Sequence, residues 1–412
     1  MGSFSFGSGN AAQLARIPLH LLGALATKLI PRRADAWVFG CAIGIGEGAL
    51  ALWPHVASAG HPAVWLVDSA EDAADAARRG IPTARRDSLR GFWLTARARF
   101  AVVTHGAGDV NRYALDGAFL VQLWHGIPLK RIGLDSSVTA RAPLPIPGLS
   151  RLVRAAYRRT QRRIRLIPAA SHLVRGRLES AFGLDDARVP VTGEPRTDVL
   201  FDGDAVTRRE RARDVIAGAV GDVGDSRLVL YAPTWRDGAA DPAVPTEGQW
   251  EQILEVLDRE DAVLLVRSHP LGAGDYRTQA RGPRVRSLGS DLLPEVTPVL
   301  PGIDVLITDY SSLVFDTALV PLPVVYLAPD EADYAATRGF YGDYRAVAGP
   351  EVAADWSVAT AQLATVLSDE EERSGRVERA RALSRRVHAH RDGRSAERVY
   401  RAIVQSWERK RR

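Results

Sequence analysis

The sequence predicts an α/β protein of two domains, each built on a parallel β-sheet with helices on both faces. Its 412 residues are too many for one ordinary hydrophobic core and suit two domains of roughly 150 to 200 residues. Short apolar runs alternate with helix-like segments in two separate series. Such alternation is typical of parallel strands joined by crossover helices.

The first series of expected strands lies between residues 35 and 126. Each run ends near Gly, Asp or His, and alanine-rich segments such as residues 71–79 lie between runs. The expected strands are DAWVFGC (35–41), AVWLVDS (63–69), FAVVTH (100–105) and GAFLVQLWHG (117–126). The glycines at positions 40, 44, 46 and 48 do not have the G-x-G-x-x-G spacing, so they favour a tight turn over a dinucleotide site.

The second series starts at residue 227, and a strand-free segment at residues 201–226 precedes it. Its expected strands are RLVLYAPTW (227–235), AVLLVRSHP (262–270), DVLITDYSS (304–312) and LPVVYLAPD (322–330). We therefore expect two Rossmann-like domains facing a central cleft, at residues 1–200 and 227–412. Residues 201–226 are expected to form the interdomain linker and to contain a helix.

The composition matches a soluble globular protein, with 46% hydrophobic and 25% charged residues. Cys41 is the only cysteine, which excludes an internal disulfide and a multi-cysteine zinc site and favours a reducing cytosol. A cleaved signal peptide is not expected, because the first ten residues carry no positive charge. The net charge of +5 is mild, so the position of the cations matters more than their sum.

Two basic segments are candidates for binding an anionic membrane surface or a polyanionic acceptor. Residues 11–30 have helical polar spacing and precede Arg32 and Arg33, which fits either a helix in the membrane interface or a helix packed on its own domain. Residues 151–165 are crowded with arginine, which fits a solvated helix face or an anion-binding surface. The candidate surface residues are Arg16, Arg32, Arg33, Arg151, Arg154, Arg158 and Arg162. Nucleic acid is not favoured, because aromatic residues do not interleave with these arginines.

The residues that follow each apolar run are the candidates for chemistry. Ligands of open α/β sheets bind beyond the carboxyl ends of the strands. These positions hold Thr104, His105, Trp124, His125 and Gly126 in the first series, and Thr234, Arg236, Arg267, His269 and Asp309 in the second. Polar and basic side chains at so many strand ends predict a ligand-binding crevice.

The stretch DVLITDYSSLVFDTALV indicates a strand, a turn and a helix with Ser311 or Ser312 at the N-cap. Free N–H groups at that turn can bind phosphate, although capping alone also explains the serines. Asp316 lies one helical turn further and could accept a hydrogen bond from a donor hydroxyl. His269, with Arg236 and Arg267, would place positive charge or N–H donors on a diphosphate.

Seven motifs, in order, resemble those of the CDP-glycerol glycerophosphotransferase family of teichoic acid primases and polymerases. They are LWHGIPLKRIG, VTGEPRTDVL, YAPTWRD, LVRSHP, ITDYSSLVFDTAL, YLAPDEADYAATRGFYGDY and RDGRSAERVYRAI. The resemblance runs from about residue 100 to 403. Before it, family members often carry Asn and Lys after the first glycine turn, where this chain has GIGEGALALWPHV, so the acceptor's identity stays open.

The resemblance implies a GT-B-like fold on the cytoplasmic face of the cell membrane. Residues 1–200 would bind an undecaprenyl-type lipid-linked or polymeric acceptor, and residues 227–412 a CDP-glycerol or CDP-ribitol donor. An acceptor hydroxyl would attack the β-phosphorus and expel CMP. The resemblance implies two catalytic histidines. His125 would be the general base, and His269 would lie with Ser311 and Ser312 at the donor phosphates. The remaining matched positions, expected to bind the donor, are Arg196, Asp198, Thr234, Arg236, Asp309 and Asp316.

His125 suits a base because an unperturbed imidazole titrates near pH 6.5 and can take an alcohol proton at neutral pH. No cofactor or metal is expected, since the one Asp-x-Asp spacing, at Asp202 and Asp204, falls in the expected linker. Two alternatives stay open. One is a GT-B glycosyltransferase that uses a nucleotide sugar, and the other is a catalytically silent relative that scaffolds a membrane assembly.

Overall fold

The computed structural model describes residues 17–411, except residues 138–148, 237–240, 268–275 and 277. The chain forms two compact units. The first comprises Met1–His125, Ile132–Asp198 and Ala389–Arg412, and the second comprises Gly126–Arg131 and Val199–His388. These bounds differ from the expected ones, because residues 201–226 lie within the second unit and residues 389–412 return to the first.

The first unit contains a parallel sheet with the strand order β3-β2-β1-β4-β5-β6. Its strands are β1 (Arg33–Gly40), β2 (Ala63–Val67), β3 (Thr83–Arg85), β4 (Ala98–Val103), β5 (Phe119–Gln122) and β6 (Ile164–Leu166). The central strand β1 pairs Val38 with Val64 on one side and with Ala101 on the other. The four strands expected in this region are confirmed, whereas β3 and β6 are too short to show a period in the sequence.

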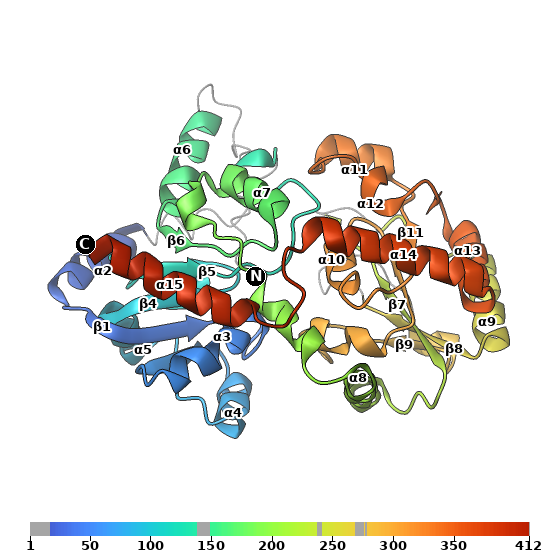
Figure 1. Cartoon of the computed structure of the whole chain (residues 1–412), viewed down its shortest axis with the longest axis horizontal. Coiled ribbons are helices and arrows are strands. Elements are labelled where there is room, and N and C mark those ends of the chain that lie inside the picture. Colours follow the sequence, from blue (N-terminus) through green and yellow to red (C-terminus); the bar gives the residue numbers. More distant parts are fainter. Residues whose placement is uncertain (1–16, 138–148, 237–240, 268–275, 277, 412) are drawn as a thin grey trace. The chain divides into compact units, whose positions relative to one another are not determined.

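Helices cover this sheet and close its core. They are α2 (Ile17–Leu29), α3 (Glu47–Ser58), α4 (Ala70–Arg78), α5 (Leu89–Arg97), α6 (Leu149–Gln161), α7 (His172–Phe182) and α15 (Ser395–Arg411). The core stacks Trp37 on Phe100, with 4.3 Å between ring centroids, and α15 adds Val399 and Ile403 to it. Figure 1 shows α15, the last helix of the chain, lying along the sheet of the first unit.

The second unit repeats the architecture with the strand order β12-β11-β10-β7-β8-β9. Its strands are β7 (Arg227–Ala232), β8 (Ala262–Val266), β9 (Val285–Ser287), β10 (Val305–Thr308), β11 (Val324–Leu327) and β12 (Val352–Ala353). β8 and β10 are buried along their whole length, as expected for parallel strands that helices cover on both faces. The four strands expected here are confirmed, and the missed β9 and β12 are again very short.

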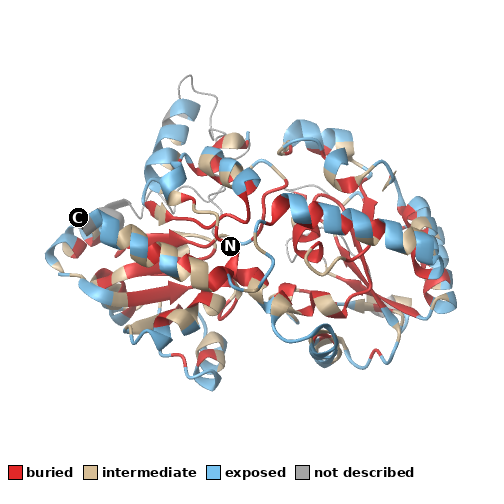
Figure 2. Ribbon diagram, viewed as in Figure 1, coloured by how far each residue is buried: buried red, intermediate tan, exposed pale blue. Residues whose placement is uncertain are grey.

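The helices of the second unit are α8 (Ala205–Val220), α9 (Glu247–Arg259), α10 (Leu313–Thr317), α11 (Glu331–Thr337), α12 (Arg345–Ala348), α13 (Trp356–Ser368) and α14 (Glu370–Val387). Local signals set several helix starts. Thr246 and Gln249 form a capping box at α9, and Asp204 caps α8. The core of this unit gathers Tyr231, Trp250 and Trp356 between sheet and helices. Figure 2 shows buried strands and exposed outer helix faces in each unit.

Each sheet reverses its strand order once, and these two switch points locate the candidate chemistry. In the first unit the reversal lies between β1 and β4, and in the second between β10 and β7. Neighbouring strands there connect in opposite directions, and ligands of such sheets bind beyond the carboxyl ends of these strands. Cys41 and Thr104 follow the two strands of the first switch point, and Thr234 and Asp309 follow those of the second.

The helix α2 packs through one face and exposes another. Gly23 allows close approach, since a Cβ there would lie 2.4 Å from the Tyr113 carbonyl oxygen, and Thr27 is buried. Leu22, Leu25 and Leu29 are instead 63%, 59% and 79% exposed. Within the described residues, no helix has the length and apolarity needed to span a membrane.

Candidate active site

His125 lies just past β5, between two residues with unusual backbone conformations. Trp124 has φ 64° and Gly126 has φ 142°. A bulky residue at positive φ costs free energy and persists only where surrounding contacts impose it, often at functional sites. Trp124 packs edge-on against Phe182 of α7, at 5.0 Å between centroids, which supplies one such contact.

The imidazoles of His105 and His125 are stacked in the first unit. Their centroids lie 4.4 Å apart and their planes differ by 4°. His125 Nδ1 lies 3.5 Å from the Thr104 carbonyl oxygen. A carbonyl oxygen can only accept, so this contact favours the tautomer with the proton on Nδ1 and the lone pair on Nε2, as a base requires.

The loop that carries His105 is fixed by one carboxylate. Asp109 Oδ2 accepts hydrogen bonds from the backbone N–H groups of Thr104 (2.9 Å), His105 (2.7 Å) and Gly106 (3.3 Å). Gln122 of β5 donates to the Thr104 carbonyl oxygen at 2.8 Å, which ties the loop to the strand before His125. Burial lowers the pKa of His105, although Asp109 opposes this, so burial favours the neutral ring.

Cys41 and Glu47 complete this first switch point. Glu47 begins α3 with φ 54°, a left-handed conformation that directs its side chain toward the ends of β1 and β4. Its Oε2 lies 3.8 Å from Cys41 Sγ and 3.6 Å from His105 Nδ1. Burial and the Glu47 carboxylate raise the pKa of the Cys41 thiol well above its ordinary value. The strand-end rule pointed to His105, but no sequence signal linked it to these two residues.

Arg236 is the centre of the second switch point, and its charge is already paired. It donates to Asp309 at 2.8 Å and to both carboxylate oxygens of Asp330 at 2.8 and 2.9 Å. The guanidinium also lies 5.0 Å from the Tyr310 ring centroid and 4.8 Å from that of Tyr334. Burial alone would lower the pKa of Arg236, but Asp330 and Asp309 raise it. These contacts favour an organising role over the expected direct contact with a diphosphate.

Two other residues expected to bind the donor also have protein partners. Asp309 accepts the backbone N–H groups of Thr234 (2.8 Å) and Tyr310 (2.6 Å) besides its bond to Arg236. Arg267 donates to the carbonyl oxygens of Leu288 (3.1 Å), Leu293 (2.8 Å) and Pro294 (3.1 Å). These bonds fix the conformation of the chain at the ends of β7, β8 and β10. Other residues would therefore have to balance the negative charge of the donor's phosphates.

The Thr234 hydroxyl and the Lys130 ammonium remain for a ligand at this switch point. Thr234 is 8% exposed, and its Oγ1 has no hydrogen-bond partner among the described residues. A buried hydroxyl without a partner is costly, so it points to a ligand or water. Burial lowers the pKa of Lys130 to about 8, with Asp309 raising it and Arg338 and Arg236 lowering it further.

Lys130 lies at the second switch point because residues 126–131, which belong to the second unit, pair with another loop of that unit. Arg131 donates its backbone N–H to the Gly339 carbonyl oxygen (3.0 Å), and Tyr341 donates to that of Leu129 (2.9 Å). Lys130 therefore stands opposite Phe340 in an antiparallel bridge. Lys130 lies in the motif LWHGIPLKRIG, but no local pattern assigns it a role, because the bridge joins residues far apart in the chain.

The turn after β10 does not have the capped helix start that was expected to bind phosphate. Ser312 occupies the N-cap of α10 without a capping hydrogen bond, and Ser311 Oγ accepts the Leu313 N–H instead, at 3.3 Å. α10 has only five residues, so its dipole is weak. Asp316 is buried, which leaves its carboxylate little surface for a donor hydroxyl.

Arg196 and Asp198, expected to bind the donor, lie in the first unit and have local partners there. Arg196 pairs with Glu194 at 3.1 Å, and both are buried. Asp198 accepts the backbone N–H groups of Ser395 (3.0 Å) and Ala396 (2.7 Å) at the start of α15. Burial raises the pKa of Asp198, while these two bonds lower it. Its structural role is thus to cap α15.

The expected surface arginines separate into two groups. Arg32 is not a free surface cation, because its guanidinium donates to the carbonyl oxygens of Thr95, Ala98, Ala114 and Asp116. Burial lowers its pKa to about 10. Arg33 is exposed and lies 3.7 Å from Asp35. The other four candidates, at and just beyond α6, are all exposed: Arg151, Arg154, Arg158 and Arg162. Arg16 and His269 lie outside the described residues.

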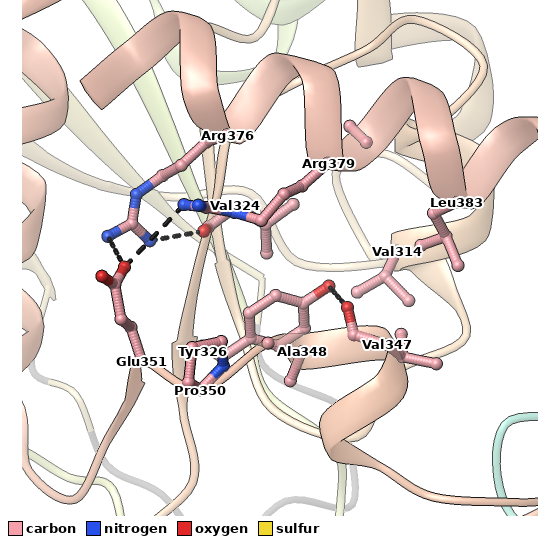
Figure 3. Close-up of a pocket in the computed structure, with 12 residues that line it drawn as sticks. Val314, Val324, Tyr326, Val347, Ala348, Pro350, Glu351, Arg376, Arg379 and Leu383 are labelled. Atoms are coloured by element: carbon pink, nitrogen blue, oxygen red, sulfur yellow. Dashed lines mark hydrogen bonds and ion pairs between the residues drawn. The ribbon is translucent and has the colours of Figure 1, made fainter. Parts of the chain in front are cut away.

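A pocket elsewhere in the second unit contains none of the expected site residues. β11, α12 and α14 line it, and Figure 3 shows Arg376 directed at Glu351 on its rim. Arg376 also donates to Glu372 (2.6 Å) and to the Val324 carbonyl oxygen (2.9 Å), so its charge is paired. The Tyr326 hydroxyl donates to the Val347 carbonyl oxygen at 3.3 Å. Arg379, the other arginine among the described residues of this pocket, lies 3.8 Å from Glu351 and 3.7 Å from Glu372, so both arginines already face carboxylates.

Comparisons with known proteins find a matching family model, curated relatives and solved structures. The model of the family described as CDP-Glycerol:Poly(glycerophosphate) glycerophosphotransferase matches residues 55–405. Teichoic acid glycerol-phosphate transferase of Staphylococcus aureus (strain NCTC 8325 / PS 47) is 26% identical over 280 residues, or 65% of this chain and 67% of that protein. Teichoic acid ribitol-phosphate polymerase TarL of the same strain is 29% identical over 229 residues, or 55% of this chain.

A solved structure extends the likeness to nearly the whole chain. The wall teichoic acid polymerase TagF matches with a TM-score of 0.75 and 19% identity, over 97% of this chain and 96% of that one. At this identity the match shows the fold, and it confirms the expected GT-B-like class with two parallel-sheet α/β domains. The chain spans 39% and 35% of the first two curated relatives it matches.

Proposed function

The chain belongs to the CDP-glycerol:poly(glycerophosphate) glycerophosphotransferase family, and we propose that it transfers a polyol phosphate from a CDP-activated donor to an acceptor hydroxyl. The donor is CDP-glycerol or CDP-ribitol, and the product is a teichoic-acid-like cell-wall polymer. The same family match favours this reaction over the nucleotide-sugar alternative. The activated donor is a substrate, and the transfer is proposed to need no redox cofactor.

The donor's place is proposed at the second switch point, and the buried Thr234 hydroxyl carries this assignment. It lies beyond the carboxyl end of β7, where a ligand of such a sheet is expected, and it lacks a described partner. The Lys130 ammonium adds the positive charge that a diphosphate needs, since Asp309 and Asp330 already pair the charge of Arg236. Phosphoryl transfer depends mainly on such positioning and charge stabilisation.

The proposed reaction is a displacement at the β-phosphorus of the donor. The acceptor oxygen forms a bond to that phosphorus, and the bond to the bridging oxygen breaks, so CMP leaves with that oxygen. His125 Nε2 takes the proton of the acceptor hydroxyl. Only four residues separate His125 from Lys130, so the extended chain spans at most about 18 Å between them.

The acceptor is proposed to be lipid-linked or polymeric, and the protein to work at the inner face of the cell membrane. The exposed leucines of α2 and the exposed arginines of α6 support this proposal. Leucines that enter the interface and arginines that attract anionic lipid are the two components of peripheral binding. An undecaprenyl-type acceptor would be presented at the same surface.

A panel of donors tests the reaction. The full chain is incubated with CDP-glycerol, CDP-ribitol, a UDP-sugar or a GDP-sugar, together with a synthetic lipid-linked acceptor. Released nucleotide is quantified, and the product is weighed by mass spectrometry. We expect CMP release and a mass gain of one polyol phosphate per CMP. Release of UDP or GDP would establish the glycosyltransferase instead, and nucleotide binding without turnover would establish the silent scaffold.

A further inference from the structure

The first switch point gathers three side chains of the kinds that bind transition metals. Cys41 follows β1, Glu47 begins α3 and His105 follows β4. One ligand atom from each lies within 4.8 Å of the other two. The Cys41 side chain is buried, and those of Glu47 and His105 are only 13% and 21% exposed. The proposed transfer gives these three residues no part.

The spacing of the donor atoms fits a single tetrahedral ion. Zinc bonds of about 2.3 Å to sulfur and about 2.0 Å to nitrogen and oxygen place neighbouring ligand atoms about 3.3 to 3.5 Å apart. The observed separations are 3.8 Å from Cys41 Sγ to Glu47 Oε2 and 3.6 Å from Glu47 Oε2 to His105 Nδ1. The third pair, Cys41 Sγ and a ring nitrogen of His105, lies within 4.8 Å, so these two atoms would need to approach each other by at most about 1.3 Å.

We propose that Cys41, Glu47 and His105 form a binding site for one divalent transition-metal ion, for which Zn²⁺ is best suited. Thiolate, imidazole and carboxylate are the ligands that zinc proteins use. Three protein ligands leave the fourth position open to water or another oxygen ligand. The site departs from the expectation, drawn from the sequence, that the protein binds no metal, and it does not depend on the proposed transfer.

The surroundings already hold the ligands in place. Asp109, which is not one of the three ligands, fixes the backbone of His105: its Oδ2 accepts the His105 backbone N–H at 2.7 Å. The atom of His105 that faces Glu47 is Nδ1, which also lies 2.9 Å from Thr104 Oγ1. That hydroxyl has a second acceptor in Asp109 Oδ2 at 3.4 Å, so it can release Nδ1 without losing its hydrogen bond. Hydrogen bonds of this kind, from residues that do not bind the ion themselves, orient the ligands in metal sites.

Cobalt(II) provides a direct test, because Cys41 is the only cysteine of the chain. Any thiolate-to-cobalt charge-transfer band must therefore come from this residue. The full chain is freed of metal with a chelator, titrated with Co²⁺ and followed by ultraviolet and visible absorption. We expect a band that saturates at one equivalent, together with intense tetrahedral ligand-field bands. Zn²⁺ should then bleach both, since it binds such sites more tightly than Co²⁺.

Three substitutions and a control identify the ligands. Cys41→Ser should abolish the charge-transfer band, and Glu47→Gln and His105→Ala should each weaken Co²⁺ binding at least tenfold. His61→Ala serves as the control in the same unit, since His61 bonds the Tyr400 hydroxyl at 3.0 Å and should not change the titration. Circular dichroism confirms that each variant is folded, and the wild-type spectrum decides the main question without any variant.

Two results would overturn the proposal. One is the absence of a charge-transfer band at Co²⁺ in large excess over the protein. The other is a band whose titration is unchanged in both Glu47→Gln and His105→Ala, which would leave a lone thiolate with solvent ligands. Neither result depends on turnover of a CDP-polyol, so failure here is distinct from failure of the proposed function.

Discussion

At the scale of single residues, His125 is positioned by its neighbours in the chain and in the fold. The strained Trp124 and the left-handed Gly126 set its backbone, and the His105 ring stacks on its imidazole. The Thr104 carbonyl oxygen, held by Gln122, faces its Nδ1. These contacts fix one ring orientation and favour the tautomer with its proton on Nδ1 and its lone pair on Nε2.

Replacing His125 with Ala should remove the base and spare the donor site. We expect kcat to fall by about 10²- to 10⁴-fold, as is usual for loss of a general base, with little change in the KM for the CDP-polyol. Steady-state release of CMP measures both values. His61→Ala, elsewhere in the first unit, should leave both unchanged. A rise in KM as large as the fall in kcat would assign the ring to donor binding.

Replacing Lys130 tests the cation proposed for the donor diphosphate. Lys130→Met should raise the donor KM by about 10- to 100-fold, because a hydrogen bond to a charged group contributes about 1.5 to 3 kcal/mol. Arg131→Met, one position away, is the control. A comparable loss in that control would indicate damage to the bridge with Phe340 and not loss of a phosphate contact.

The pH dependence gives a second readout for the same lysine. With a pKa of about 8, Lys130 carries its charge below that pH and loses it above. The donor KM of the wild-type protein should therefore rise as the pH increases through 8. Lys130→Arg keeps its charge over this range and should flatten the profile. An unchanged profile in Lys130→Arg would show that another group titrates.

At the scale of elements, α2 and α6 carry the features proposed for the membrane surface. α2 packs on the first unit through Gly23 and Thr27, which leaves its leucine face exposed. α6 carries arginines at helical spacing on its exposed surface. A packed helix and an interfacial helix were alternatives in the sequence, and the structure shows packing on one face together with leucines exposed on another.

Changing Leu22, Leu25 and Leu29 together to Asp should reduce binding to anionic liposomes by at least about 100-fold. Each buried leucine contributes about 1.5 to 3 kcal/mol, and the new carboxylates are repelled by the lipid. Sedimentation with liposomes measures the effect. Leu89→Asp is the control, since Leu89 is 90% exposed on α5 and has no proposed membrane role. Unchanged sedimentation of the triple variant would rule out this face as the anchor.

At the scale of the whole molecule, the chain crosses between its two units more than once. Residues 126–131 belong to the second unit, and residues 389–412 return to the first. Asp198 caps α15 at its start, and Val399 and Ile403 join the aromatic core around β1. The last helix of the chain is thus part of the first hydrophobic core.

Ile403→Ala tests this connectivity. The lost methyl groups should cost about 2 to 5 kcal/mol in the first core. Hydrogen exchange should therefore speed up at the amides of β1 and β4, while those of β7 and β8 keep their protection. Leu363→Ala, in the core of the second unit, should give the reverse pattern. Faster exchange confined to β7 and β8 in Ile403→Ala would restore the expected boundary at residues 227–412.

The sequence alone determined the fold class and much of the candidate site. Eight apolar runs of the expected length became β-strands, because a buried parallel strand must be apolar along its length. The strand-end rule identified Thr104, His105, His125, Thr234 and Asp309, since the ends of strands are set by the same local pattern. Strands of two or three residues were missed because they are too short to have a period.

Only the tertiary structure decided which of these residues act together. Arg236 meets Asp330 across 94 positions, and this pairing already balances a cation that was expected at a phosphate. The β-bridge between Lys130 and Phe340 brings the Lys130 ammonium within the electrostatic influence of Asp309. Cys41, Glu47 and His105 come together where the strand order of the first sheet reverses. The spacing of apolar residues along the chain indicates which residues are buried. Strand order and long-range pairing depend instead on how distant segments pack, so no local sequence pattern could reveal these groupings.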